Sequence, residues 1–394
     1  MNVNKYDVII AGSGFTGSIL ARKLAEERNL KVCVVEKRAQ ISGNMYDEYD
    51  DGILIQRYGP HVFHTDRDDL YNYLLRFCKM DDYKPECKVV IDGKEMTTPF
   101  NFESIDLLYS MEEGESLKNK LKDCFGQRES VSVLELLENE EEDVRNYGEL
   151  LFKKDYEPYN MKQWGISADQ IDRSVIERHP VFLSYRKILH MQKYTVIPVG
   201  GFYKLFHNML DHPNIDIILN QDINDLIDIC WSEKRIKING ENWNKILIYT
   251  GPIDELCDYQ FGELPYRTLN IVYQKMNIKS YQESPVLVYP QAEGYTRIIE
   301  YTKMPFQDVG EKTIVATEYP VQYNKNSDNC SEPYYPIIND KNLLLYKRYK
   351  DIVRSVPNLY VCGRLGDYKY YDMDKAMERA LQVFEEISMK NGWK

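Results

Sequence analysis

The stretch Tyr6-Asp-Val-Ile-Ile-Ala-Gly-Ser-Gly-Phe-Thr-Gly17 decides the fold. Residues 8–10 form a short apolar run, which is typical of a buried parallel strand. The glycines that follow are spaced as in a dinucleotide-binding turn. Gly12 permits the tight turn, Gly14 lets the backbone approach a pyrophosphate, and Gly17 lets the next helix pack on the strand.

A helix over residues 18–27 is predicted after this turn, with its positive N-terminus facing the phosphates. A second apolar run, Val32-Cys-Val-Val35, ends at Glu36, which lies 19 residues after Gly17. An acid at this place accepts ribose hydroxyls and disfavours a 2′-phosphate. A glycine motif alone would also fit an unliganded turn. The strand, helix and acid together favour dinucleotide binding.

Composition bounds the class of protein. The 394 residues leave room for two or three domains, and 62 acidic against 50 basic residues give a net charge of −12, which disfavours nucleic acid as a partner. Eight scattered cysteines without a CxxC pair indicate reduced thiols and a cytoplasmic location. No run of 18 apolar residues is present, and the N-terminus leads straight into the first strand, so we expect neither a membrane span nor a signal peptide.

A second segment near the other end points to the same site. Residues 359–362 are strand-like, Gly363-Arg364 follows, and a helix with an apolar face is predicted from about Asp372. This segment looks like the one that covers a flavin ring. A helix N-terminus aimed at the flavin pyrimidine would stabilise negative charge on a reduced ring. Taken alone, the segment also fits a plain strand and helix that complete a sheet.

The pattern between these segments predicts a discontinuous α/β fold. Residues 88–100 form one expected hairpin around Asp92-Gly93, and residues 235–249 form another around Asn239-Gly240. A capping box at Ser132 opens one of several expected helices. We therefore expect a Rossmann-like FAD-binding domain over residues 1–83, 196–244 and 337–394, a helical insert domain over 101–180, to which the resemblance described below gives an implied substrate and dimer role, and an antiparallel sheet domain over 84–100 and 245–336.

Taken together, the motifs resemble the bacterial UDP-galactopyranose mutase family over nearly the whole chain. Besides the glycine turn and the Gly363–Met373 run, the resemblance rests on these stretches: Glu36-Lys-Arg, Ser42-Gly-Asn44, Tyr58-Gly-Pro-His-Val-Phe-His-Thr65, Lys162-Gln-Trp-Gly165, Ile197-Pro-Val-Gly-Gly-Phe-Tyr-Lys204, Tyr249-Thr-Gly-Pro-Ile-Asp254, Tyr295-Thr-Arg-Ile-Ile-Glu300, Glu318-Tyr-Pro320 and Glu332-Pro-Tyr-Tyr-Pro336.

The resemblance implies an isomerase that interconverts UDP-galactopyranose and UDP-galactofuranose for cell-surface polysaccharide synthesis. Its cofactor is implied to be reduced FAD, whose N5 attacks the anomeric carbon as UDP leaves. The sugar adduct opens, recloses through the 4-hydroxyl and takes UDP back, so there is no net redox change. An external reductant such as NAD(P)H and a homodimer are implied as partners.

The resemblance also assigns residues. The implied catalytic group is Arg297, His61, His64, Asp372 and Tyr370, with Arg297 on the diphosphate and the histidines beside the flavin. A metal at the two histidines is rejected, because their motif lacks carboxylate or thiol ligands. The implied FAD contacts are Gly12, Gly14, Phe15, Thr16, Gly17, Glu36, Lys37, Gly43, Asn44, His61, Gly363, Arg364, Tyr371, Asp372 and Met373. The implied substrate contacts are Tyr159, which stacks the uracil, and Trp164, Phe182, Arg186, Tyr194, Arg297, Tyr319 and Tyr370.

Two positions depart from the family. An essential arginine is expected at the end of an Arg-x-Pro-Val-Arg segment, and this chain reads Arg178-His-Pro-Val-Phe182; an asparagine is often found where Val288 stands. Either Arg186 or Arg178 replaces the lost cation, or activity is weak, or the sugar differs; a 6-deoxy hexose on UDP or dTDP would suit a more apolar pocket. A flavin oxidoreductase of the amine oxidase type and a silent nucleotide-sugar-binding paralogue are the remaining alternatives.

Overall fold

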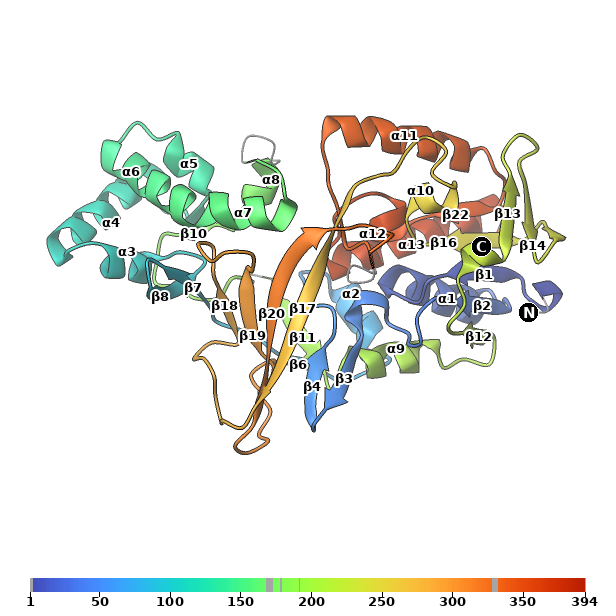
Figure 1. Cartoon of the computed structure of the whole chain (residues 1–394), viewed down its shortest axis with the longest axis horizontal. Coiled ribbons are helices and arrows are strands. Elements are labelled where there is room, and N and C mark those ends of the chain that lie inside the picture. Colours follow the sequence, from blue (N-terminus) through green and yellow to red (C-terminus); the bar gives the residue numbers. More distant parts are fainter. Residues whose placement is uncertain (1–2, 168–172, 178, 191, 328–331, 394) are drawn as a thin grey trace.

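The computed structural model describes residues 3–167, 173–177, 179–190, 192–327 and 332–393. The chain builds three units (Figure 1). A parallel sheet with helices on both faces occupies one end of the molecule, a group of helices occupies the other, and a sheet with long strands lies between them. No helix in the described part of the chain is long and apolar enough to cross a bilayer.

Five parallel strands form the sheet of the first unit, which confirms the Rossmann-like prediction. Their order is β12 (Ile215–Ile218), β2 (Val32–Val35), β1 (Val8–Ala11), β16 (Ile246–Tyr249) and β22 (Leu359–Val361). Every residue of β1, β2 and β16 is buried, because helices or strands cover both faces. One face packs on α1 (Phe15–Glu27), α9 (Phe202–Leu210) and α13 (Met373–Lys390). The other packs on α10 (Ile253–Leu256), α11 (Asp340–Arg354) and the sheet β13 (Ile227–Cys230), β14 (Arg235–Ile238) and β15 (Glu241–Trp243).

The second predicted hairpin is wrong in its return strand. β14 turns at Asn239-Gly240, both with positive φ, and pairs with β15 rather than with residues 245–249. Those residues instead form β16, which lies beside β1 in the parallel sheet. The sequence Ile-Leu-Ile-Tyr is apolar throughout, so burial on both faces suits it better than an exposed hairpin. Residues 246–249 were expected at the start of the antiparallel sheet domain. In the structure they belong to the parallel sheet of the Rossmann-like unit.

The middle unit is a seven-stranded sheet. Its order is β21 (Tyr335–Pro336), β17 (Tyr266–Met276), β20 (Thr313–Gln322), β19 (Arg297–Glu300), β18 (Val286–Val288), β7 (Cys87–Ile91) and β8 (Lys94–Thr98). Neighbouring strands run antiparallel, except that β18 and β7 are parallel. The hairpin predicted over residues 88–100 is present as β7 and β8.

The helical unit follows β8. It contains α3 (Phe102–Leu108), α4 (Met111–Phe125), α5 (Val133–Leu137), α6 (Glu142–Leu151), a π-helical turn (Phe152–Tyr156), α7 (Glu157–Trp164) and α8 (Arg173–Ile176), with β9 (Ser130–Val131) and β10 (Val181–Phe182) paired beneath. The predicted capping box at Ser132 is confirmed, and Asn101 and Ser110 cap α3 and α4 in the same way.

Short elements join the first two units. A three-stranded sheet contains β5 (Phe63–Thr65), β11 (Tyr194–Pro198) and β6 (Met80–Asp82). A separate pair of strands is formed by β3 (Asp47–Asp50) and β4 (Ile53–Gln56). The fold is completed by α2 (Asp68–Leu75), α12 (Gly363–Gly366) and single 3₁₀ turns at Val3–Lys5, Gly43–Met45 and Ile223–Asp225. The β5 and α12 segments carry predicted site residues toward the parallel sheet, so they set the geometry described next.

Candidate functional site

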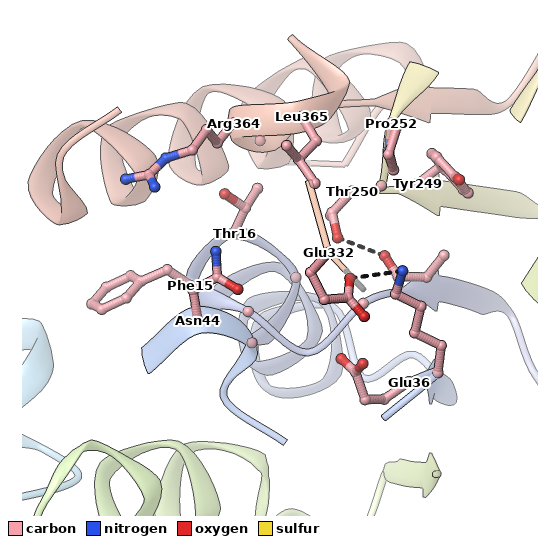
Figure 2. Close-up of a pocket in the computed structure, with 18 of the residues that line it drawn as sticks. Phe15, Thr16, Glu36, Asn44, Tyr249, Thr250, Pro252, Glu332, Arg364 and Leu365 are labelled. Carbon is pink, nitrogen blue, oxygen red and sulfur yellow. Dashed lines mark hydrogen bonds and ion pairs between the residues drawn. The ribbon is translucent and has the colours of Figure 1, made fainter. Parts of the chain in front are cut away.

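A pocket opens where the central parallel strands end. It is lined by residues that directly follow β1, β2 and β16, and by the segment from Gly363 to Ala376 (Figure 2). Ligands of open α/β sheets bind at this edge. The helix α1 begins at Phe15, three residues earlier than expected, and Gly14 precedes it without a side-chain cap. Its first N–H groups are therefore left for a ligand.

Glycines keep the floor of the pocket open. A Cβ on Gly12, whose φ is +97°, would lie 2.3 Å from Oγ1 of Thr250. A Cβ on Gly43 would lie 2.8 Å from Cα of Gly14, and one on Gly17 would lie 2.1 Å from the carbonyl oxygen of Gly12. Each contact is shorter than real Cβ atoms tolerate. The backbone is thus packed as tightly as a bound diphosphate requires.

Most of the predicted cofactor residues meet in this pocket. It is lined by Gly12, Gly14, Phe15, Thr16, Gly17, Glu36, Lys37, Gly43, Asn44, Gly363, Arg364, Tyr371 and Met373. His61 and Asp372 do not line it. Figure 2 shows Phe15, Thr16 and Asn44 on one wall and Arg364 and Leu365 on the facing wall. The two ends of the chain therefore form the two sides of one pocket.

Sequence reasoning missed a third wall. The pocket is also lined by the turn after β16, which contains Thr250, and by Asp222, Asn224 and Glu255. Thr250 donates its hydroxyl to the carbonyl of Ala11 at 2.7 Å, which ties β16 to the glycine turn (Figure 2). The apolar run at residues 246–249 was the available signal, and it was assigned to a hairpin instead.

Polar groups around the pocket favour a nucleotide-type cofactor. Glu36 accepts from the backbone N–H of Ser13 at 2.9 Å and from its hydroxyl at 2.6 Å, which fixes the carboxylate at the end of β2. Nη1 of Arg38 and Oγ of Ser42, two residues that line the pocket, are buried without a partner in the described structure. Such atoms cost free energy unless a ligand or water satisfies them. The residues present therefore fit FAD.

A second group of charges lies in the middle sheet. Arg297 on β19 pairs across strands with Glu318 on β20, and its Nε donates to the Glu318 carboxylate at 2.5 Å. Glu318 is only 1% exposed. Among the described residues, no hydrogen bond to the two terminal nitrogens of Arg297 is found, so its outer edge remains available to an anion. Val288 is the cross-strand neighbour of Arg297 on β18.

An aromatic cluster connects the pocket with this pair. The guanidinium of Arg364 lies 5.0 Å from the ring centre of Tyr370 and 5.3 Å from that of Tyr335. The Tyr335 and Tyr370 rings stack at 5.7 Å, and Trp164 lies 5.9 Å from Tyr335. Burial raises the pKa of Tyr159, while the positive charge of Arg297 acts to lower it, so the two side chains lie within electrostatic range of each other. The predicted Tyr159, Trp164, Arg297 and Tyr370 are thus brought together.

His61 is half-buried and lies within electrostatic range of both Arg364 and Arg297. Burial, together with the positive charges of Arg364 and Arg297, lowers the pKa of His61 to about 3. Its Nε2 lies 3.1 Å from the Tyr334 hydroxyl, and its Nδ1 has no partner among the described groups. The ring is therefore neutral at physiological pH, and its Nδ1 keeps a hydrogen-bonding capacity that no described group uses.

The Lys162-Gln-Trp-Gly165 motif holds α7 against the sheet. The Lys162 ammonium donates to three carbonyls of the loop before β19, those of Tyr289, Ala292 and Tyr295, at 2.6–2.9 Å. In return, Arg267 on β17 donates to the carbonyls of Lys162 and Gln163. Gly165 ends α7 with a φ of +66°, and a Cβ there would lie 2.5 Å from the Arg267 guanidinium. These bonds orient Tyr159 and Trp164.

Two predicted substrate residues, Phe182 and Arg186, contact other parts of the chain. Phe182 is fully buried, and its N–H donates to the carbonyl of Phe100. Arg186 lies over the Phe182 ring, donates to the carbonyl of Ile188 and pairs loosely with Glu129 at 3.9 Å. No contact of either residue with Arg297 is found in the described structure. Arg178 lies outside the described residues.

Tyr194 and Tyr319 also have other neighbours. Tyr194 stacks on Tyr71 at 3.9 Å and donates its hydroxyl to Asp68. Tyr319 follows Glu318 on β20, so it points to the opposite face of the sheet, where it packs edge-on against Tyr295 at 6.0 Å.

His64 on β5 has an unexpected partner. Its ring stacks on that of His190 with centres 4.3 Å apart. Burial and the neighbouring His64 lower the pKa of His190 to about 4, while Asp372 acts in the opposite direction. His190 had no motif signal, because its pairing with β5 arises only in the folded chain.

Comparison with known proteins decides the family. A sequence model described as UDP-galactopyranose mutase matches residues 154–370, and one for an NAD(P)-binding Rossmann-like domain matches residues 10–79. The UDP-galactopyranose mutase of Mycoplasma pneumoniae is 32% identical over 98% of this chain and 97% of its own. The chain belongs to the UDP-galactopyranose mutase family.

Other family members and a solved structure agree. The dTDP-fucopyranose mutase of Escherichia coli is 31% identical over 98% of both chains. A crystal structure of reduced UDP-galactopyranose mutase has the same fold, with a TM-score of 0.71 and 16% identity over 97% of this chain and 93% of that one. As a UDP-galactopyranose mutase family member, the protein is an isomerase with a flavin-type Rossmann domain.

Proposed function

We propose that the protein interconverts UDP-galactopyranose and UDP-galactofuranose with reduced FAD. One observation carries the proposal: Arg297, held by the buried Glu318, lies within electrostatic range of Tyr159 and Tyr335, and the cluster of Tyr335, Tyr370 and Arg364 continues to a cofactor pocket of the dinucleotide-binding type. A diphosphate at Arg297 would place its sugar between the two.

The FAD would lie in the pocket between Gly12–Gly17 and Gly363–Met373. When bound and reduced, it supplies the nucleophile for the anomeric carbon. The glycine turn and the α1 N-terminus would hold its diphosphate, and Glu36 its ribose. The neutral His61, with its free Nδ1, would hydrogen-bond at the flavin edge without adding a third positive charge beside Arg364 and Arg297.

The substrate contacts follow from the second group of residues. Arg297 would bind two diphosphate oxygens through its terminal nitrogens, while Glu318 fixes its orientation. Tyr159 would stack on the uracil, a contact that contributes about 1–3 kcal/mol. Tyr370, held by stacking on Tyr335 and Arg364, would contact the phosphate beside the flavin. Closing this site excludes water and strengthens each charge interaction.

We also propose the remaining roles on the same basis. Arg186 would reach the substrate after the loop around residues 183–190 moves, because its present partner Glu129 is exposed and distant at 3.9 Å. Such exposed pairs contribute about 1 kcal/mol or less, so substrate could displace it. NAD(P)H would be the reductant, the helical unit would carry a homodimer contact, and the reaction would take place in the cytoplasm.

A mutase for another nucleotide hexose is the second candidate. Val288 beside Arg297 and the buried Phe182 make this region less polar, and a 6-deoxy sugar would suit it. The test is to incubate dithionite-reduced protein with a panel of UDP- and dTDP-hexoses and to separate pyranose from furanose products. Furanose from UDP-galactose supports the first function. Furanose only from a dTDP-6-deoxyhexose supports the second, and none from any sugar refutes both.

A further inference from the structure

The helix α11 carries an unusual surface for a chain with a net charge of −12. It lies along the outer edge of the Rossmann-like unit, at the top of the view in Figure 1. Leu344 is 67% exposed and Leu343 is 40% exposed. The same helix carries five cations, Lys341, Lys347, Arg348, Lys350 and Arg354. We call these seven side chains the α11 surface.

The helical repeat gathers these residues on one side. Turning 100° per residue, the buried Asn342, Tyr349 and Val353 occupy the inner face of α11. The opposite, outward face has Lys347, Asp340 and Asp351 at its centre, and the two leucines lie on either side of them. Lys341 and Arg348 lie next to Leu344, and Lys350 and Arg354 lie next to Leu343. Exposed apolar side chains bordered by cations are thus a consequence of the sequence order.

The cations of the α11 surface have no acidic partners in the described part of the chain. No ion pair to any of the five is found among the described residues. The guanidinium of Arg348 lies over the Phe261 ring at 4.2 Å and the ammonium of Lys350 lies 5.5 Å from the Tyr346 ring, so these two cations make cation–π contacts but keep their charge unpaired. Acidic side chains nearby have other partners: Glu263 pairs with Lys325, and Asp367 with Arg379.

The acids of α11 itself do not cancel this charge. Asp340 lies in the first turn, where a carboxylate stabilises the helix N-terminus, and Asp351 is the only other acid on the helix. The helix therefore carries a local excess of three positive charges. Because solvent screens charges beyond about 8–10 Å, the distant acidic residues weaken this field little.

We propose that the α11 surface docks the enzyme onto an anionic lipid bilayer. Two exposed leucines can enter the headgroup region, while the surrounding lysines and arginines remain at the level of the phosphates. A nucleic acid partner would use the cations but leave the leucines without a role. The net positive charge of α11 and its two exposed leucines together select an anionic lipid surface, with the helix lying parallel to that surface.

The test is co-sedimentation of the intact flavoprotein with vesicles. We expect binding to vesicles of phosphatidylcholine with phosphatidylglycerol, little binding to phosphatidylcholine alone, and loss of binding at high salt. Lys347→Glu/Arg348→Glu should weaken partitioning at least about tenfold, because each basic side chain near an anionic surface contributes measurably. Leu344→Gln should weaken it less and leave the salt dependence unchanged.

A matched variant controls for total charge. Lys234→Glu/Lys237→Glu changes the net charge equally, on exposed positions around β14, and should bind vesicles as the unaltered protein does. All variants should keep their thermal midpoint and mutase activity, which tests folding. Equal loss in both double variants, equal binding to neutral vesicles, or no binding would overturn the proposal. Sedimentation that shows self-association through the α11 surface, without vesicle binding, would assign it to a second copy.

Discussion

Replacing Arg297 by methionine separates two roles of one buried pair. Glu318 is 1% exposed, and Arg297 is the cation that holds it. The substitution leaves this carboxylate buried without its partner. Breaking a buried ion pair from one side costs about 3–5 kcal/mol. Because Arg297 itself is about a quarter exposed, we expect the low end, about 3 kcal/mol, in the free energy of unfolding.

The same variant should lose transition-state stabilisation. The diphosphate would lose a charge-assisted contact in a closed site, which we expect to cost about 2–4 kcal/mol in kcat/KM, or roughly 30- to 1,000-fold. Arg297→Lys keeps a point charge but loses the planar fork of the guanidinium. Its kcat/KM should therefore lie between that of the original enzyme and that of Arg297→Met. The assays are denaturant unfolding, and kcat/KM of the reduced enzyme on UDP-galactopyranose.

A double variant distinguishes the effect of Arg297 on stability from its effect on activity. Arg297→Met/Glu318→Gln removes the stranded charge together with its partner, so stability should return to within about 1 kcal/mol of the original. Activity should remain as low as in Arg297→Met, because the anion clamp is still missing. Recovery of activity in the double variant would mean that Arg297 acts only by holding Glu318. A loss below twofold in Arg297→Met would refute the clamp altogether.

Four further predictions test other parts of the site. Gly43→Ala places a Cβ 2.8 Å from Gly14, so the purified variant should retain much less FAD by absorbance; full FAD content would refute the assigned cradle. Turnover should require reduced flavin, and equal activity of the oxidised enzyme in anaerobic assays would exclude this chemistry. The pKa of His61 is about 3 in the folded protein and 6.5 in the unfolded chain. Between these pH values the unfolded chain binds more protons, so the free energy of unfolding decreases on acidification. The loss is about 1.4 kcal/mol at pH 5.5. His61→Asn should lose this part of the pH dependence of unfolding, and an unchanged profile would count against a neutral buried ring. Arg186→Ala should reduce kcat/KM severely and Phe182→Arg should not raise it, whereas the reverse pattern would show that Phe182 is simply a lost arginine.

The cofactor half of the site could be predicted because its signals are local. Gly12, Gly14 and Gly17 act within one turn, and their backbone requirement leaves a pattern in the sequence. The wall at Thr250 was missed although it lies in the same pocket. Its position depends on β16 pairing with β1, and a short apolar run fits either a parallel strand or a hairpin.

The residues predicted to bind substrate are positioned by contacts that leave no recognisable pattern in the sequence. Lys162 and Arg267 bind backbone carbonyls, and any residue can supply a carbonyl, so neither partner could be inferred from the chain. The stack of His64 on His190 joins residues 126 positions apart that have no shared motif. Phe182 was noticed as a departure, but its burial beneath Arg186 required the folded structure.

The two positions that depart from the family pattern, Phe182 and Val288, both lie outside the cofactor pocket. The glycine cradle and Arg364 belong to the parallel-sheet unit, whereas Val288 lies in the middle sheet and Phe182 beneath the helical unit. Under the proposed function, changes on that side would alter the surroundings of the sugar and diphosphate without disturbing the cofactor pocket. The E. coli relative, at 31% identity, is a mutase for a dTDP-linked sugar, so the family carries more than one sugar nucleotide on this fold. Substrate preference in this chain should therefore respond to substitutions at Val288 and Arg186, while FAD affinity stays constant; variants that lose both together would show that the two halves are coupled.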